Sequence, residues 1–174
     1  NRVINGDMVG ITLVDSGNNT IQRNVALVDN SALTNCGIHV QGTASAKNMF
    51  RQNLTSGNKM AGFMLSGAGP GNILMDNTVI NNGRDAITNT RTDGTWIEGN
   101  RVSYNRGSWG TTPYPAEAAG AGRGITIGSS DGVTVFDNRG RNNTGVDLNW
   151  DGSGANKFQA NACDTATQPG GCAK

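Results

Sequence analysis

The residues best suited to chemistry in this 174-residue chain are a few arginines and aspartates. Arg84 and Asp85 are adjacent, and Arg123 and Asp147 follow later in the sequence. Removal of the proton beside a sugar carboxylate needs a base, together with a cation that stabilises the resulting enolate. Arg84 or Arg123 could neutralise the carboxylate, and His39 or Asp147 could take the proton. Hydrolysis of a glycosidic bond needs two carboxylic acids, and Asp85 with Asp147 are the obvious pair. The candidate catalytic residues are therefore Asp85, Arg123 and Asp147.

A repeat built on asparagine must position these residues. Six asparagines each follow a short apolar run, and a large apolar residue stands three positions before each of them. Asn suits turns because it tolerates left-handed backbone geometry and its amide bonds to backbone groups, and stacked asparagines can form a ladder. The asparagines are Asn24, Asn53, Asn77, Asn100, Asn138 and Asn161, and the apolar residues are Ile21, Phe50, Leu74, Ile97, Val135 and Phe158.

Each repeat also contains a glycine or alanine followed by alternating apolar and polar residues, as in 10–13 and 62–65. Alternation with a period of two indicates β-strands, and short strands that recur at this interval stack in parallel. We therefore predict an all-β fold, a right-handed single-stranded parallel β-helix (solenoid) of about six coils of 21–27 residues. The whole chain, 1–174, is expected to form one such domain.

The alternation predicts a column of side chains on the outer surface of the solenoid. Asp85 and Arg123 align just before this column in neighbouring coils, so they either belong to a site or form a structural ion pair. His39 is three coils from Arg123, about 14 Å at the usual strand spacing, which is too far for one reaction centre. The predicted members of the column are Thr12, His39, Met64, Thr88, Thr126 and Asp147.

The recurring Asn-x-Ile-x-x-Asn and Gly-Ile-x-Leu phrases resemble the repeats of the pectin-lyase-like superfamily over essentially the whole chain. That superfamily includes polysaccharide lyases, polygalacturonases, mannuronan epimerases, phage tailspikes and periplasmic copper-insertion proteins. The resemblance therefore implies the fold and leaves the activity open. The sequence lacks the Asp-Pro-His catalytic phrase and the Gly-Gly-x-Gly-x-Asp calcium repeat of mannuronan epimerases.

Residues 106–123 form the one large insertion between coils, and they include two aromatic residues, Trp109 and Tyr114. Exposed aromatic rings stack on the apolar faces of sugars, while arginine side chains bind sugar carboxylates. We therefore expect Arg84, Trp109 and Tyr114 to bind substrate. The alternative is that Trp109 folds back over the flank of the solenoid.

The two ends of the chain differ in their patterns. Residues 162–174 leave the repeat, and Cys163 and Cys172 are spaced for a disulfide that closes this segment as a cap; two free thiols are the alternative. A disulfide implies an oxidising compartment, so we expect a secreted, cell-surface or periplasmic protein. Cys36 is expected to be a small buried apolar residue. The sequence begins in mid-coil, so we expect upstream β-helix coils or a partner chain to cover that end.

Composition limits the remaining functions. A net charge of +1 gives no electrostatic reason to expect nucleic acid, and no apolar run approaches the roughly 20 residues that span a membrane. A single histidine cannot form a multi-histidine copper site, and we expect no metal or other cofactor. Two functions stay open. One is a β-helix that binds an acidic polysaccharide or acts on it as a lyase, epimerase or hydrolase; the other is a non-catalytic structural or adhesive solenoid.

Overall fold

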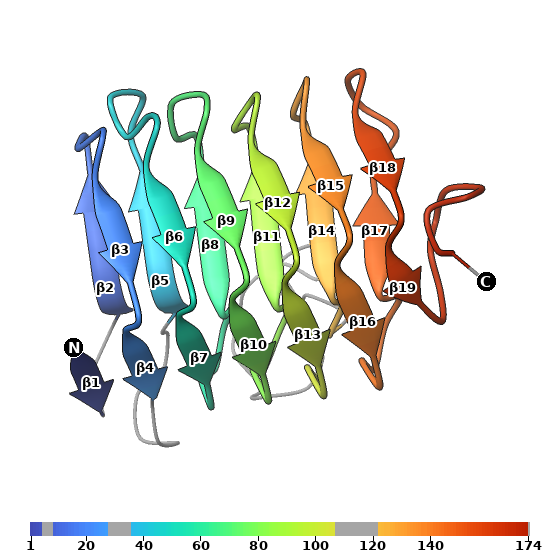
Figure 1. The fold of residues 1–174 in the computed structure, drawn as a ribbon, viewed down its shortest axis with the longest axis horizontal. Coiled ribbons are helices and arrows are strands. Elements are labelled where there is room, and N and C mark those ends of the chain that lie inside the picture. The colour runs from blue at the N-terminus through green and yellow to red at the C-terminus, as the bar shows by residue number, and fades with distance from the viewer. Residues whose placement is uncertain (5–8, 28–35, 107–121, 174) are drawn as a thin grey trace, which may run out of the picture.

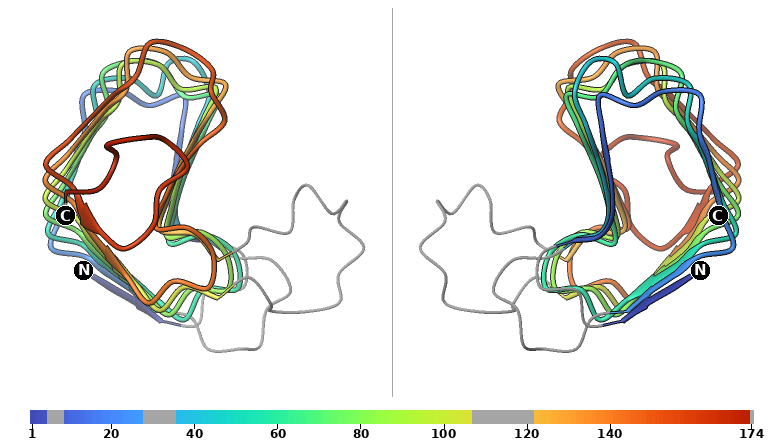
Figure 2. Two further views of the ribbon diagram at one scale, coloured as in Figure 1. Left: turned by 90° about the vertical axis from the view of Figure 1, so that its right-hand side faces the viewer. Right: turned by 90° about the vertical axis from the view of Figure 1, so that its left-hand side faces the viewer.

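The computed structural model describes residues 1–4, 9–27, 36–106 and 122–173. Within these ranges the chain forms short β-strands, and no helix there is long and apolar enough to cross a membrane. Corresponding strands of successive coils pair in parallel, so three sheets run along one axis (Figure 1). Viewed along that axis, the coils lie on top of one another (Figure 2).

The three sheets contain seven, six and six strands. The seven-stranded sheet consists of β1 (Arg2–Ile4), β4 (Val25–Leu27), β7 (Leu54–Ser56), β10 (Thr78–Ile80), β13 (Arg101–Ser103), β16 (Arg139–Arg141) and β19 (Ala162–Cys163). The first six-stranded sheet consists of β2 (Val9–Val14), β5 (Cys36–Gln41), β8 (Phe63–Ser66), β11 (Ile87–Thr90), β14 (Ile125–Gly128) and β17 (Leu148–Trp150). The second consists of β3 (Thr20–Gln22), β6 (Met49–Arg51), β9 (Ile73–Met75), β12 (Trp96–Glu98), β15 (Thr134–Phe136) and β18 (Lys157–Gln159).

This topology confirms the predicted right-handed parallel β-helix, the hand that parallel crossovers adopt. Asparagines bonded across one coil measure its length, which is 23 residues between Asn77 and Asn100 and 24 between Asn53 and Asn77. The coil between Asn24 and Asn53 has 29 residues, so the predicted range of 21–27 was wrong there. The 38-residue coil between Asn100 and Asn138 contains the predicted insertion.

The interior is a column of apolar side chains that repeats the sequence pattern. Four of the six apolar residues three positions before the ladder asparagines are fully buried, and Ile21 and Phe158 pack against the same core. Phe50 and Phe63 meet edge to face, with ring centroids 6.0 Å apart. Each fully buried apolar side chain contributes about 1.5–3 kcal/mol, which one isolated coil could not obtain.

Buried asparagines join the coils at the turn between the second six-stranded sheet and the seven-stranded sheet. The Asn77 amide nitrogen donates to the Asn100 side-chain oxygen at 2.9 Å and to the Phe50 carbonyl at 2.9 Å. This predicted ladder runs through Asn1, Asn24, Asn53, Asn77, Asn100, Asn138 and Asn161. A second ladder contains Asn58, Asn82, Asn105 and Asn143, and a third, unpredicted column begins with Asn19, Asn48 and Asn72.

The left-handed backbone at this turn belongs to the residue before each ladder asparagine. Gln52 has a φ of 55° and Asp76 a φ of 53°, whereas Asn53 and Asn77 do not adopt positive φ. The asparagine therefore contributes its amide, which bonds to the next coil, and the expectation that it was needed for left-handed geometry was wrong. The cost of left-handed geometry, about 1–2 kcal/mol per residue, falls on its neighbour.

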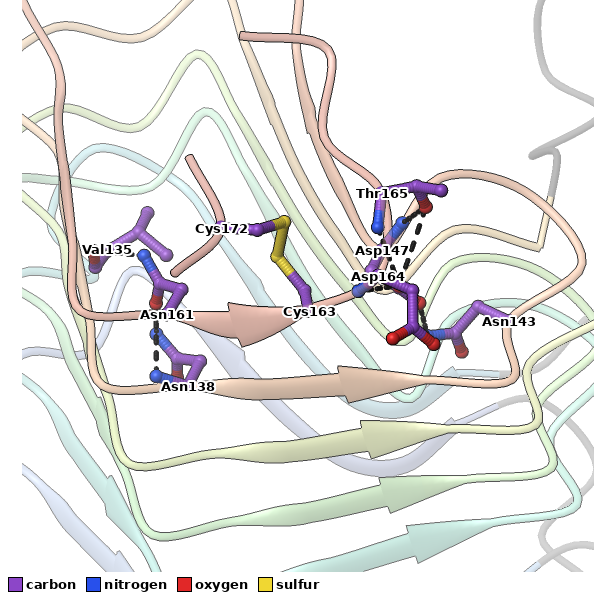
Figure 3. The surroundings of a disulfide bond; sticks show 9 residues. All are labelled: Val135, Asn138, Asn143, Asp147, Asn161, Cys163, Asp164, Thr165 and Cys172. Atoms are coloured by element: carbon purple, nitrogen blue, oxygen red, sulfur yellow. Dashed lines mark hydrogen bonds between the residues drawn. A yellow bond between two sulfur atoms is a disulfide. The ribbon is translucent and has the colours of Figure 1, made fainter. Parts of the chain in front are cut away.

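Residues 162–173 lie across the last coil (Figure 2). The predicted disulfide joins Cys163 of β19 to Cys172 (Figure 3). Isolated parallel bridges pair Leu148 with Ala166 and Ala162 with Ala173. The segment therefore continues the strand pairing of two sheets. Cys36 is buried, as expected, at 4% exposure.

The register predicted for the last coil was wrong by two residues. Leu148 pairs with Ile125 and Asn149 with Thr126, so Asp147 lies beside Gly124 and not in the outer column. The sequence Gly145-Val146 imitates the glycine-apolar start of the other coils, which explains the wrong alignment. The outer column is otherwise as predicted from Thr12 to Thr126.

Candidate functional site

Asp85 and Arg123 lie at equivalent positions of adjacent coils, as predicted, and the contact is more than an ion pair. Asp85 Oδ1 accepts a hydrogen bond from the Arg123 backbone N–H at 2.9 Å, and Oδ2 accepts one from Thr126 Oγ1 at 2.6 Å. The Arg123 guanidinium is 4.0 Å from Oδ2, and the Asp85 side chain is only 7% exposed. Both carboxylate oxygens therefore hold the next coil in place.

Asp147 has a similar environment at the C-terminal end of the solenoid (Figure 3). Its Oδ1 accepts a hydrogen bond from Asn143 Nδ2 at 2.8 Å, and its Oδ2 accepts from the backbone N–H of Asp164 at 2.9 Å and of Thr165 at 3.3 Å. The residue is 4% exposed. This carboxylate anchors the segment that crosses the last coil.

The two predicted catalytic carboxylates, Asp85 and Asp147, are thus both engaged in hydrogen bonds within the protein. They are two coil spacings apart, about 10 Å, and each uses both oxygens in hydrogen bonds within the protein. A general base needs a free lone pair in reach of the substrate. The contacts give Asp85 and Asp147 a structural task, and their catalytic role stays a prediction.

The predicted substrate-binding residues are only partly within the described ranges. Trp109 and Tyr114 lie outside the described residues, as does most of the 106–123 insertion. Arg84 is half-buried, and its backbone N–H donates to the Met60 carbonyl at 3.3 Å.

The structure brings together a different set of arginines, on the outer face of the seven-stranded sheet. Arg101 of β13 pairs in register with Arg139 of β16, and Arg141 lies two residues further along β16 on the same face. All three are exposed and line a cavity of about 650 Å³ together with Tyr104. We call Arg101, Arg139, Arg141 and Tyr104 the arginine face.

Tyr104 gives the arginine face an aromatic side chain. It is 49% exposed, its φ is 58°, and its backbone N–H donates to the Arg141 carbonyl at 3.4 Å. Among the described residues, no carboxylate lies within ion-pair distance of Arg101, Arg139 or Arg141. The face therefore has three positive charges without an internal counter-charge.

The sequence contains a signal that could have found these arginines. Arg101 and Arg139 each directly follow a ladder asparagine, and Arg141 comes two residues later. In a strand those positions point away from the core, because the residue between them points inward. Extending the asparagine alignment by three residues would have shown the face.

Two sulfur-containing side chains, Cys36 and Met64, meet on the first six-stranded sheet. Cys36 Sγ is 4.0 Å from Met64 Sδ, and His39, in the same strand as Cys36, pairs in register with Met64. Burial raises the pKa of the Cys36 thiol to about 11, against the Ala61 backbone hydrogen bond and the charge of Arg84, which lower it. Burial also lowers the pKa of His39, so the imidazole is neutral at pH 7.

The stacked coils, the three parallel sheets and the asparagine ladder define the class of the protein, a parallel β-helix. The chain belongs to the NosD family, described as "Periplasmic copper-binding protein (NosD)", whose profile matches residues 1–166. The chain is therefore a periplasmic or secreted β-helix protein, as predicted.

The fold is also similar to a solved structure, the crystal structure of the periplasmic alginate epimerase AlgG. The TM-score is 0.61 and the sequence identity is 20%; the match covers 88% of this chain and 32% of AlgG. The chain thus corresponds to about a third of the length of AlgG, and at this identity the likeness concerns the fold. A comparison with curated proteins gave no match.

Proposed function

We propose that the arginine face binds an acidic polysaccharide. The observation that carries the proposal is the register pair of Arg101 and Arg139, two like charges on adjacent strands. Like charges directly opposite each other on neighbouring strands destabilise the fold. An anion bound between the two guanidinium groups would remove this repulsion. Guanidinium groups bind carboxylates through paired hydrogen bonds, and Arg101, Arg139 and Arg141 offer three.

The geometry favours a polymer over a small anion. Arginines on neighbouring coils are about 4.8 Å apart along the solenoid, which lets carboxylates on successive sugar units bind successive coils. Tyr104 can stack on the apolar face of one of those sugars. AlgG, named as an alginate epimerase, acts on such a polymer, but the proposal for this chain rests on its own arginines.

Binding is better supported than catalysis. The described carboxylates nearest to the predicted chemistry, Asp85 and Asp147, are occupied by internal hydrogen bonds. A lyase, epimerase or hydrolase activity would therefore need a base from another part of the protein. A non-catalytic structural solenoid is the alternative, in which no polysaccharide binds this face.

The test measures binding of alginate and polygalacturonate, with dextran as the neutral polymer, by isothermal titration calorimetry. Replacing Arg101, Arg139 and Arg141 together with Gln should weaken acidic-polymer binding by about three- to 150-fold, since each exposed charge pair contributes about 0.2–1 kcal/mol. Arg91→Gln removes an exposed arginine elsewhere and should have no effect. Tyr104→Asn tests stacking at a left-handed position that Asn tolerates.

Two outcomes would contradict the proposal. Dextran bound as tightly as alginate would show that charge is not recognised. No binding of any polymer, or equal loss in Arg91→Gln and in the triple variant, would favour the structural solenoid.

The family description also names copper, and the donors of this chain limit which copper ion it could bind. The chain has one histidine, and among the described residues no three His, Cys, Asp or Glu side chains are close enough to hold a metal. Cu(II) prefers imidazole and oxygen ligands in square geometries, so the donors do not fit it. Thiol and thioether sulfurs suit Cu(I), and Cys36 and Met64 supply both.

A further inference from the structure

We propose that the outer face of the second six-stranded sheet is the interface of a symmetric dimer of this chain. The strands of that sheet, β3, β6, β9, β12, β15 and β18, lie side by side along the solenoid (Figure 1). The interface lies on a different sheet from the arginine face, so the inference goes beyond the proposed polysaccharide binding.

The outer face of this sheet has large apolar side chains on three neighbouring strands. In each strand the middle residue points into the core, so the first and third residues point outward. The outward residues of β6, β9 and β12 are Met49 and Arg51, Ile73 and Met75, and Trp96 and Glu98. Trp96 is 42% exposed, and Phe136 extends the apolar surface in β15. Contiguous apolar side chains on an outer surface are typical of a protein–protein interface.

Two charged side chains lie on this face, one on each side of Met75. Arg51 and Glu98 each pair in register with Met75, so they are two strand spacings apart, about 10 Å, in one row. Among the described residues neither forms an ion pair, and Arg51 Nε is buried without a hydrogen-bond partner. Glu98 Oε2 accepts a hydrogen bond from Trp96 Nε1 at 2.7 Å, which leaves Oε1 for another donor. Each charge therefore lacks a counter-charge within the described part of its own chain.

A second copy of the chain supplies both counter-charges at once. A twofold axis that runs along β9, between two facing copies, exchanges the strands on either side of β9. Arg51 of each copy then faces Glu98 of the other, because the two residues are in one row at equal distances from β9. Met75, which lies between them, faces its own counterpart.

The same twofold axis also matches the apolar row. Met49 and Trp96 both pair in register with Ile73, on its opposite sides. Met49 of each copy therefore faces Trp96 of the other, and methionine sulfur packs favourably against aromatic rings. The hydrogen bond to Glu98 holds the Trp96 indole in place. A different protein or a sugar would need its own matching pattern, whereas a second copy already has it.

The face is small, so we expect a weak dimer. Six strands at the usual spacing extend for about 24 Å along the solenoid, and the two outward rows are about 7 Å apart. A face of that size is below the roughly 800 Å² that each partner buries in a standard complex. We therefore expect a dissociation constant on the order of 100 μM.

The test is sedimentation of the full chain, with its disulfide intact and without polysaccharide, over concentrations that bracket about 100 μM. We expect the average mass to rise from that of one chain, 18.1 kDa, towards that of two. Arg51→Glu and Glu98→Arg each place like charges at both contacts. Each should therefore weaken association by about a hundredfold or more.

The decisive measurement mixes these two variants. In a mixed pair the glutamates of the first variant face the arginines of the second at both contacts, so the mixture should associate although neither variant does so alone. The double variant, Arg51→Glu with Glu98→Arg, exchanges the charges and should restore association. Arg139→Glu makes the same charge change on the seven-stranded sheet and, as the matched control, should have no effect.

Circular dichroism of each variant separates a lost interface from a lost fold. If Arg51→Glu does not fold, Glu98→Arg and Trp96→Ala still decide. Trp96 is exposed, and removal of a tryptophan at the centre of an interface should weaken association by about tenfold or more.

Three results would overturn the dimer. They are a chain that stays monomeric throughout the concentration series, association that Arg139→Glu weakens as much as Glu98→Arg does, and a mixture of the two folded single variants that does not associate. None of these measurements contains a polysaccharide, so the dimer and the proposed function can fail separately.

Discussion

Two sets of charged side chains lie within a few coils of one another, and the fold places them in opposite situations. Asp85 and Asp147 are buried, and each accepts hydrogen bonds with both carboxylate oxygens. Arg101 and Arg139 are exposed and stand beside each other without a carboxylate partner among the described residues. The two aspartates join coils to one another, whereas the two arginines can still form ion pairs with a ligand.

The difference shows what decides a residue's role in a solenoid. Every side chain has a neighbour one coil away at about 4.8 Å, so the residue at that place determines whether a charge is neutralised. Asp85 meets a backbone N–H, a hydroxyl and a guanidinium, and it is neutralised. Arg139 meets another arginine, so its charge is available to a ligand.

The comparison requires that Asp85 stabilises the fold. Its replacement should have the largest effect on stability of the variants described here. Asp85→Ala leaves the Arg123 N–H and the Thr126 hydroxyl without their acceptor, which should lower the free energy of unfolding by about 2–4 kcal/mol. The measurement is the urea midpoint followed by circular dichroism. Asp164→Ala removes an exposed carboxylate and should leave the midpoint unchanged.

The opposite result is equally informative. If Asp85→Ala unfolds at the same urea concentration as the unsubstituted chain but abolishes turnover of a polyuronate, Asp85 is a catalytic residue and the comparison is broken.

Asp147→Asn should have a smaller effect, about 1–2 kcal/mol, because the amide keeps one acceptor oxygen for the backbone N–H of Asp164 and Thr165. The other carboxylate oxygen becomes an NH₂ group facing Asn143 Nδ2, which is also a donor. Hydrogen exchange should report the loss as faster opening of residues 162–173. Asp137→Asn, at an exposed left-handed position, is the control, and equal exchange in both variants would refute the anchoring role.

The fold could be predicted from the sequence because a solenoid repeats in one dimension. Each coil places an asparagine and a large apolar residue at the same phase, so six weak signals reinforce one another. The register of the last coil was not predictable in that way. Gly145 and Val146 copy the local pattern, whereas in the structure Leu148 pairs with Ile125 and Asp147 contacts Thr165 and Asp164 of the last segment.

The site was harder to predict, since charge alone does not reveal whether a partner is present. Asp85 and Arg123 were correctly placed side by side, but the Thr126 hydroxyl and the backbone N–H that complete the contact are not visible in the sequence. Arg101 and Arg139 each follow a ladder asparagine in the sequence, but the sequence does not show that they pair in register. Their ability to bind an anion depends on the lack of a nearby carboxylate, and only the structure shows which residues lie near them.

The smallest effect is expected for a substitution that gives the arginine face a negative charge, which would sharpen the comparison. Arg101→Glu places a carboxylate opposite Arg139 in place of a second guanidinium, so the variant should be more stable by about 0.2–0.5 kcal/mol, the low end for an exposed cross-strand pair. Arg101→Gln only removes the repulsion and should gain less. The gain should shrink as salt is raised, because exposed charges are screened. A thermal midpoint that falls in Arg101→Glu and does not depend on salt would mean that Arg101 and Arg139 do not repel each other. The face would then have no electrostatic reason to bind an anion.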